Sequence, residues 1–292
     1  MSLHSFLTRV IWLCVLPLVL LAAYLAADQV RTTQLANDIE AANLAKNFAT
    51  AIDHNLTARI GALHVLAASP LADQASHWKE LYQEAQGFRQ NFDSHVILAD
   101  REMRILFNTR APFGIKQPVL PRPKGRAAAP TAIETGMPAV GDIYFGPTTK
   151  ESMVAIAVPG MREGKVSFLV LATSETRQFQ GRIDQVALPS GWSLALLDGN
   201  GETIARRAPP GVNSANDIDA AGRFVAKSAL SPWSVVLEIP RDIYRAPLMA
   251  AAAALVIAIL GATLAGVLGG PLASRRLGKS VALLAEIPAP RA

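Results

Sequence analysis

A basic stretch in the middle of the chain carries the residues whose types favour ligand binding. Residues 100–126 contain seven lysines and arginines but only two acidic residues. The planar guanidinium of Arg110 can hold a carboxylate through two parallel hydrogen bonds. Asn108 and Arg110 follow one predicted strand, and Asp142 and Tyr144 open the next. These four residues are our candidate binding site for an anion such as a small carboxylate.

The same residues also have a purely structural interpretation. A basic loop is commonly a solvated surface. Tyr144 alternates with its neighbours Ile143 and Phe145, as packing side chains do along a strand. Both interpretations stay open at the level of sequence.

Catalytic and metal-binding patterns are missing from the sequence. We find no phosphate-binding loop, no nucleophile elbow and no metal-ligand pair with useful spacing. The segment 198–201 resembles half a calcium loop, but it lacks the later acidic ligands and is better explained as a hairpin turn. Cys14 is the single cysteine, so no disulfide can form within the chain. We expect no catalytic residue, no metal site and no cofactor. Metal binding by histidine pairs on a helix needs i, i+4 spacing, which none of these residues has: His54, His64, His77 and His95.

The positive charge of the chain is concentrated at its ends. The formal net charge is +5, yet residues 28–245 hold 23 basic and 22 acidic residues. The remaining surplus flanks two uncharged segments, 10–27 and 246–274. This distribution indicates membrane topology rather than a nucleic-acid-binding surface.

The two uncharged segments are predicted to be transmembrane helices. The first, 18 residues long, would reach roughly 27 Å, close to the thickness of the bilayer core. A cleavable signal peptide is the alternative, although no small-x-small cleavage site stands out. The second is followed by Arg275, Arg276 and Lys279, which favours a cytoplasmic C-terminus. We therefore predict a multi-pass protein of the cell (inner) membrane with residues 28–245 extracytoplasmic, although Arg241 and Arg245 oppose this orientation. A small-residue face at Gly266 and Gly270 would permit close helix contact in a homodimer, and glycine near a helix end explains the same pattern equally well.

The extracytoplasmic segment has an α+β pattern. Apolar residues recur every three or four positions from 30 to 68, which predicts one long helix that ends before Pro70. A second helix is predicted at 76–87. Five strands follow at 94–99, 103–108, 141–145, 153–158 and 166–172, with a short helix at 131–135. After a helix near 175–186, four more strands are predicted at 192–197, 202–206, 223–229 and 233–239. Antiparallel sheets of this kind need one covered face, and the long helix is the expected cover.

This order of elements resembles the double Cache (tandem PAS-like) extracytoplasmic sensor domains of bacterial transmembrane receptors. The resemblance covers about residues 30–275 and is closest to the sensor half of membrane-bound histidine kinases. It depends on the strand-turn-strand segment 96–110, on Pro112-Phe-Gly114 and on 140–147. It also depends on Gly191-Trp192, on the turn 198–201 and on Ser231-Pro-Trp-Ser-Val-Val.

The resemblance implies a long helix packed on tandem PAS-like antiparallel sheets, flanked by two transmembrane helices. Its parts would be a cytoplasmic N-terminus (1–9), transmembrane helix 1 (10–27), the long helix (28–69), a membrane-distal Cache lobe (70–187), a short membrane-proximal lobe (188–243), transmembrane helix 2 (246–270) and a cytoplasmic juxtamembrane segment (271–292). Family ligands bind the distal lobe. The proximal lobe is short, so a pocket there is not expected.

The function implied is that of a transmembrane signal-transduction sensor. It would bind a small ligand and relay a conformational change, as the input part of a two-component histidine kinase. Its expected partners are that ligand, the membrane, a second copy of the chain and a cytoplasmic kinase or other output module, with no nucleic acid. The alternative is a membrane-anchored scaffold that senses nothing and recruits a protein through its extracytoplasmic domain.

Overall fold

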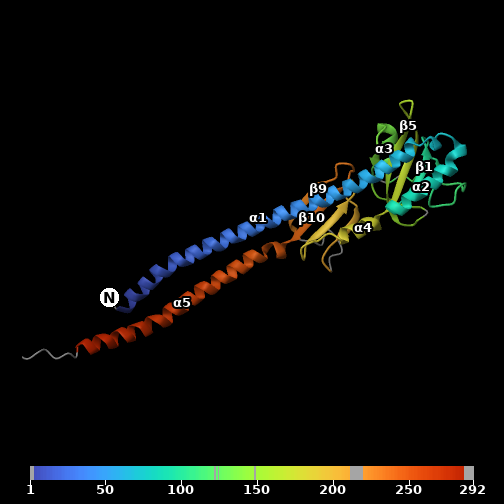
Figure 1. The fold of residues 1–292 in the computed structure, drawn as a ribbon. Helices are drawn as coiled ribbons and strands as arrows, with labels where there is room; N and C mark the ends of the chain where they lie inside the picture. The colour runs from blue at the N-terminus through green and yellow to red at the C-terminus, as the bar shows by residue number, and fades with distance from the viewer. Residues whose placement is uncertain (1–2, 122, 124, 148, 211–219, 286–292) are drawn as a thin grey trace, which may run out of the picture. The chain divides into compact units, whose positions relative to one another are not determined.

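The computed structural model describes residues 3–285 except 122, 124, 148 and 211–219 (Figure 1). The chain divides into two compact units. One consists of the two terminal segments, up to Asp38 and from Asp242, and the other is Ile39–Arg241. The second unit contains both β-sheets and is the part relevant to ligand binding.

The long predicted helix is present and extends further than expected. Helix α1 runs without interruption from Leu3 to Ala68, through the predicted first membrane span. It ends where Ser69 accepts a hydrogen bond from the Leu71 amide and Pro70 opens a short 3₁₀ turn. Its buried positions beyond residue 40 recur at intervals of three and four: Ala41, Ala45, Phe48, Ile52, Leu56, Arg59, Leu63 and Ala67.

The chain ends in a second long helix, α5 (Arg241–Ala285). Among the described residues, one helical segment is long and apolar enough to cross a membrane, namely Arg241–Gly261, with a mean hydropathy of 2.0. It overlaps the predicted second span. The first predicted span, at 10–27, contains positions whose side chains the structure does not describe, so it stays a prediction.

The distal lobe is built on an antiparallel sheet with the strand order β2-β1-β6-β5-β3, and β4 also pairs with β5. The centre of the sheet is the long β5–β6 hairpin, whose turn places Glu163 and Gly164 at positive φ. Two short 3₁₀ turns (Pro70–Ala72 and Ala75–His77) precede the lobe. Its other elements are α2 (Trp78–Phe92), β1 (His95–Asp100), β2 (Ile105–Asn108), α3 (Ala128–Thr135), β3 (Ala139–Val140), β4 (Tyr144–Phe145), β5 (Ser152–Arg162) and β6 (Lys165–Glu175).

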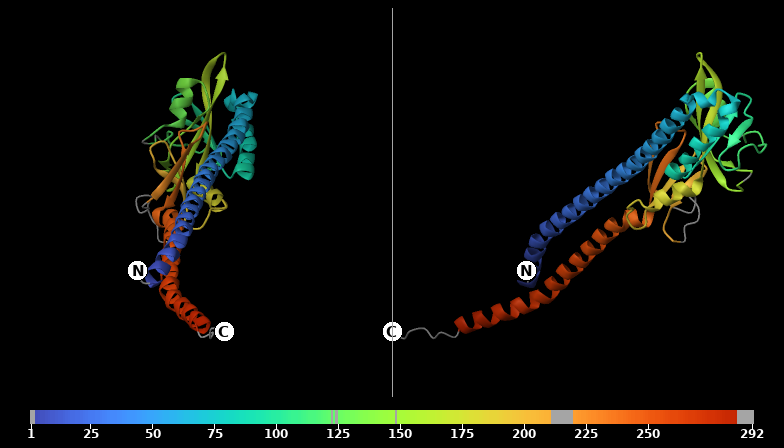
Figure 2. Two further views of the ribbon diagram at one scale, coloured as in Figure 1. Left: turned by 90° about the vertical axis from the view of Figure 1, so that its left-hand side faces the viewer. Right: turned by 45° about the vertical axis from the view of Figure 1, so that its right-hand side comes forward.

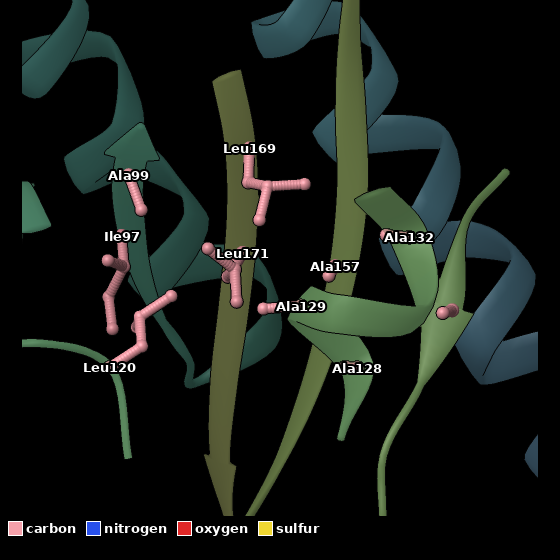
Figure 3. Packing of buried hydrophobic residues seen from close by; sticks show 10 residues of the cluster. Ile97, Ala99, Leu120, Ala128, Ala129, Ala132, Ala157, Leu169 and Leu171 are labelled. Atoms are coloured by element: carbon pink, nitrogen blue, oxygen red, sulfur yellow. The ribbon is translucent and has the colours of Figure 1, made fainter. Parts of the chain in front are cut away.

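An apolar core fills the space between this sheet and α3. Figure 3 shows α3 in front of the strands, with Leu169 and Leu171 of β6 between β1 and β5. The helical residues in this core are alanines, so α3 can lie close to the sheet. The core comprises Ile97, Ala99, Leu120, Ala128, Ala129, Ala132, Ala139, Ala157, Leu169 and Leu171.

The prediction of one strand, at 141–145, is wrong. We expected a continuous strand at 141–145, but the structure has two strand fragments, β3 and β4, separated by residues 141–143. The distal sheet therefore has six strands rather than five. The amide of Ile143 donates to the Asp198 carboxylate, 3.1 Å away, instead of to a neighbouring strand. The strand is interrupted because its middle residues bind the second lobe.

The proximal lobe is a four-stranded antiparallel sheet with the order β8-β7-β10-β9. The four predicted strands are confirmed, with shifts of a few residues at their ends. Helix α4 connects the two sheets. The elements are α4 (Thr176–Asp184), β7 (Ser193–Leu197), β8 (Thr203–Arg207), β9 (Ala220–Lys227) and β10 (Ser234–Pro240).

Helix α1 contacts both lobes. It passes β9 and β10 before it reaches the distal sheet (Figures 1 and 2). At the proximal lobe, the Asp53 carboxylate accepts hydrogen bonds from the Ala229 amide, at 2.9 Å, and from the Ser228 hydroxyl. At the distal lobe, the contact is made by the buried Arg59.

Arg59 is 2% exposed and has no carboxylate partner among the described residues. Burial and the positive charge of Arg182 lower the pKa of Arg59 to about 10, while the negative charge of Asp93 acts in the opposite direction. All five of its N–H groups meet neutral acceptors, from α1, the ends of α2, β1 and β6, and α4. These acceptors are Asn55 Oδ1, Ser94 Oγ, Ser174 Oγ, the Phe92 carbonyl and Gln178 Oε1.

Candidate functional site

Two small adjoining cavities lie on the face of the distal sheet that α3 and the preceding loop cover. The larger has a volume of about 50 Å³ and the smaller about 30 Å³. Pro121, Tyr144 and Thr173 line both, so Tyr144 stands at the boundary between them. A single water needs about 10–15 Å³ by this measure, so each cavity holds a few non-hydrogen atoms.

Three of the four predicted ligand residues meet at the larger cavity. Asn108, Arg110 and Tyr144 all line it, beside Thr173 of β6. Asn108 ends β2, and its side-chain oxygen accepts the Arg110 amide at 2.9 Å, which fixes the turn that carries the guanidinium. Burial raises the pKa of Tyr144 to about 12, and the charge of Arg110 acts in the opposite direction. The phenol therefore stays protonated at neutral pH and can donate a hydrogen bond.

The guanidinium of Arg110 is held by an acidic residue that we did not predict. Its Nη2 lies 3.1 Å from Oε1 of Glu175, the last residue of β6. The other oxygen of Glu175 pairs with Arg177, whose guanidinium also lies 3.5 Å from Glu151. The sequence offered no signal for this role because Glu175 stands at the start of a predicted helix, outside the predicted strand 166–172.

His95 is a second residue that we had not assigned to the site. Its Nδ1 is buried and lacks a hydrogen-bond partner within the described part of the chain. Burial, followed by the positive charges of Arg110 and Arg89, lowers the pKa of His95 below its usual 6.5. The imidazole is therefore neutral at neutral pH; it lines neither cavity, but it lies near enough to Arg110 to feel its charge.

Asp142, the fourth predicted residue, shares the smaller cavity with Tyr144 but does not line the larger one. It is 2% exposed, and its carboxylate faces the proximal lobe. It accepts the amides of Arg126, at 2.6 Å, and Gly199, at 2.8 Å. The side chain of Asn200 approaches it at 3.4 Å. These contacts occupy its oxygens and make it a structural residue in this state.

Asp142 belongs to a reciprocal contact between the lobes, which we call the interlobe latch: residues 141–143 with Asp198, Gly199 and Trp233. Asp142 accepts from Gly199, and Asp198 accepts from Ile143. The indole of Trp233 donates to the Gly141 carbonyl at 3.0 Å. The turn at 198–201, which we predicted as a hairpin turn, therefore also binds the wall of the cavity.

The structure describes most, but not all, of the basic residues in the loop at 100–126 that covers the cavities. Arg122 and Lys124 lie outside the described residues. Arg104 is turned toward Asp100, with which it forms an ion pair at 2.6 Å. Of the basic residues in the described part of 100–126, Arg110 alone lines either cavity.

Solved structures of receptor sensor domains share this fold. No protein-family model and no curated protein matches the chain. The ligand-binding domain of the Pseudomonas fluorescens chemoreceptor CtaA, in complex with L-isoleucine, is 13% identical with a TM-score of 0.56, and the match covers 75% of this chain and 97% of that one. Most of this chain has the fold of a receptor sensor domain. The predicted resemblance to Cache sensor domains is confirmed at the level of the fold.

Two further structures extend this similarity to other receptors. The ligand-binding domain of the Pseudomonas aeruginosa amino acid chemoreceptor PctB, in complex with L-Arg, is 15% identical with a TM-score of 0.52, covering 70% of this chain and 95% of that one. The extracellular domain of the putative histidine kinase mmHK1S-Z2 is 13% identical with a TM-score of 0.53, covering 70% and 97%. The sensor-domain fold is therefore common to chemoreceptors and histidine kinases, and it does not distinguish between them.

Proposed function

We propose that this chain is the sensing part of a transmembrane receptor, with its ligand in the distal cavity beside Arg110. The observation that carries the proposal is the position of Arg110, Asn108, Tyr144 and Thr173 around one cavity of a sensor-domain fold. A guanidinium, an amide, a protonated phenol and a hydroxyl together suit the carboxylate of a small organic molecule. Short carboxylic acids and amino acids are the first compounds to test, the latter because CtaA and PctB bind them.

The binding test is a melting-temperature screen of the full chain in detergent. The panel contains acetate, propionate, L-isoleucine and L-arginine, with glucose as a neutral control. A compound at one hundred times its Kd adds about 2.7 kcal/mol of stability, which raises the melting temperature of a domain of this size by roughly 5–10 °C. We expect Arg110→Ala to abolish the shift while the unliganded protein still melts cooperatively.

A well-folded protein that responds to no compound would contradict this proposal. It would favour the scaffold alternative, in which the extracytoplasmic domain recruits a protein partner.

We further propose that binding is relayed through α1 to the membrane, in a homodimer of the inner membrane that forms the input part of a histidine kinase. Support comes from the Asp53 and Arg59 contacts, by which one helix touches both lobes. A relay of this type is usually worth about 1–3 kcal/mol, which corresponds to ligand affinities that differ roughly 5–150-fold between two states.

The relay is tested with spin labels on α1 and α5 of the full chain in nanodiscs. Saturation with a compound that raises the melting temperature is expected to change the distance between the labels, and Arg110→Ala is expected to remove the change. An unchanged distance at saturation would contradict the relay and leave ligand binding intact.

A further inference from the structure

The ion pair between Arg110 and Glu175 bears on the class of ligand, on the premise that the proposed function is correct. Glu175 alternates along β6 with Leu171 and Thr173, which line the cavities, so its side chain leaves the sheet on the same face. Its side chain is 10% exposed, whereas that of Arg110 is 25% exposed. Glu175 does not line the larger cavity, but Arg110 does. The carboxylate therefore lies behind the guanidinium, on the side away from the ligand space.

This arrangement leaves Arg110 able to receive one carboxylate from the cavity side. A guanidinium has five N–H groups, and Glu175 engages one nitrogen, Nη2. The nearby negative charge also reduces the attraction of Arg110 for an anion in a partly buried site.

The size of the cavity restricts the ligand further. A volume of about 50 Å³ corresponds to about three to five water-sized groups. Acetate and propionate match this size, whereas a branched amino acid such as L-isoleucine exceeds it. Moreover, no carboxylate lines the larger cavity among the described residues, so an ammonium group would have no anionic partner there.

We propose that the larger cavity takes a short-chain monocarboxylate on Arg110, and that Glu175 is the specificity-determining residue that orients this guanidinium and limits its affinity. We expect a ligand without a positive charge, because the carboxylate of Glu175 lies behind Arg110 and cannot serve as the partner of an ammonium group. Arg177 shares Glu175 and thereby lessens its effect on Arg110.

The test measures propionate affinity by isothermal titration calorimetry on the full chain in detergent. Glu175→Gln keeps the shape and a hydrogen-bond acceptor but removes the negative charge, and we expect it to bind propionate about tenfold more tightly. Glu151→Gln is the matched control, because Glu151 touches Arg177 but makes no contact with Arg110, and its affinity is expected to equal the wild type.

A second variant changes affinity in the opposite direction. Arg177→Gln changes a side chain that is 71% exposed, so we expect the variant to fold normally. In this variant Arg110 is the only remaining cation that pairs with Glu175 among the described residues. We expect twofold to threefold weaker propionate binding. Propionate affinity that is unchanged or weaker in Glu175→Gln, with a melting curve like the wild type, would overturn the role of Glu175.

The outcomes also separate this inference from the proposed function. Binding of L-isoleucine or L-arginine without binding of propionate would overturn the ligand class and leave the sensor proposal standing. Binding of no compound by the wild type or by Glu175→Gln would overturn both.

Discussion

Replacing Arg59 by alanine is expected to lower the free energy of unfolding by about 3–5 kcal/mol. The two opposing effects differ in size. A pKa lowered from 12.5 to about 10 corresponds to roughly 3 kcal/mol of cost for burying the charge. The five hydrogen bonds that the charged guanidinium donates to neutral acceptors more than offset that cost. Truncation also leaves a cavity and unpaired acceptors between α1 and the distal sheet.

Thermal unfolding of the full chain in detergent checks this prediction. A loss of this size lowers the melting temperature of a domain of about 200 residues by roughly 10 °C. Arg59→Lys should fall between alanine and the wild type, because an ammonium offers three donors from one atom rather than a planar fork. Lys46→Ala, which removes an exposed cation from the same helix, is the control. Equal melting temperatures for Arg59→Ala and Lys46→Ala would show that the buried guanidinium contributes nothing to stability.

Replacing Asp142 by alanine is expected to cost about 3 kcal/mol, because the interlobe latch loses its central acceptor. The amides of Arg126 and Gly199 would lose their charged acceptor, and hydrogen bonds to a charged group contribute about 1.5–3 kcal/mol each. The site is tightly packed, since a Cβ on Gly199 would lie 2.8 Å from an Asp142 oxygen. Arg126 and Gly199 are both exposed to solvent, so water replaces part of the lost bonding and the total stays near the lower end.

The same melting experiment checks Asp142, with Glu134→Ala as an exposed acidic control in the same lobe. Hydrogen exchange adds a local readout: faster exchange is expected at residues 141–145 and 193–207, on both sides of the latch. This variant also separates the two roles considered for Asp142. Weakened ligand binding with an unchanged melting temperature would restore the sequence-based assignment to the ligand and contradict the latch.

Local patterns in the sequence were sufficient for most of the fold. The three-to-four spacing of apolar residues predicted the long helix, and Pro70 predicted its end because proline excludes helix from the preceding residue. Alternation and turn residues predicted the β5–β6 hairpin and the strand-turn-strand at 95–108. These features depend on neighbours within a few residues, and a sequence displays such neighbours directly.

The candidate site depended more on contacts between distant segments. The sequence named Asn108, Arg110 and Tyr144 by their residue types, but β2 and β4 are not neighbours in the sheet, so it is the fold that brings these residues to one cavity. Nothing in the sequence indicated Glu175, which is 65 residues from Arg110, or the partners of Arg59, which are up to 119 residues away. The sequence also placed Asp142 in a continuous strand, whereas the strand is interrupted at 141–143 and Ile143 donates to Asp198 of the second lobe. The environment of a buried charge is set by partners that only tertiary packing brings together. The sequence therefore identified most residues of the candidate site, and the fold determined what each of them does.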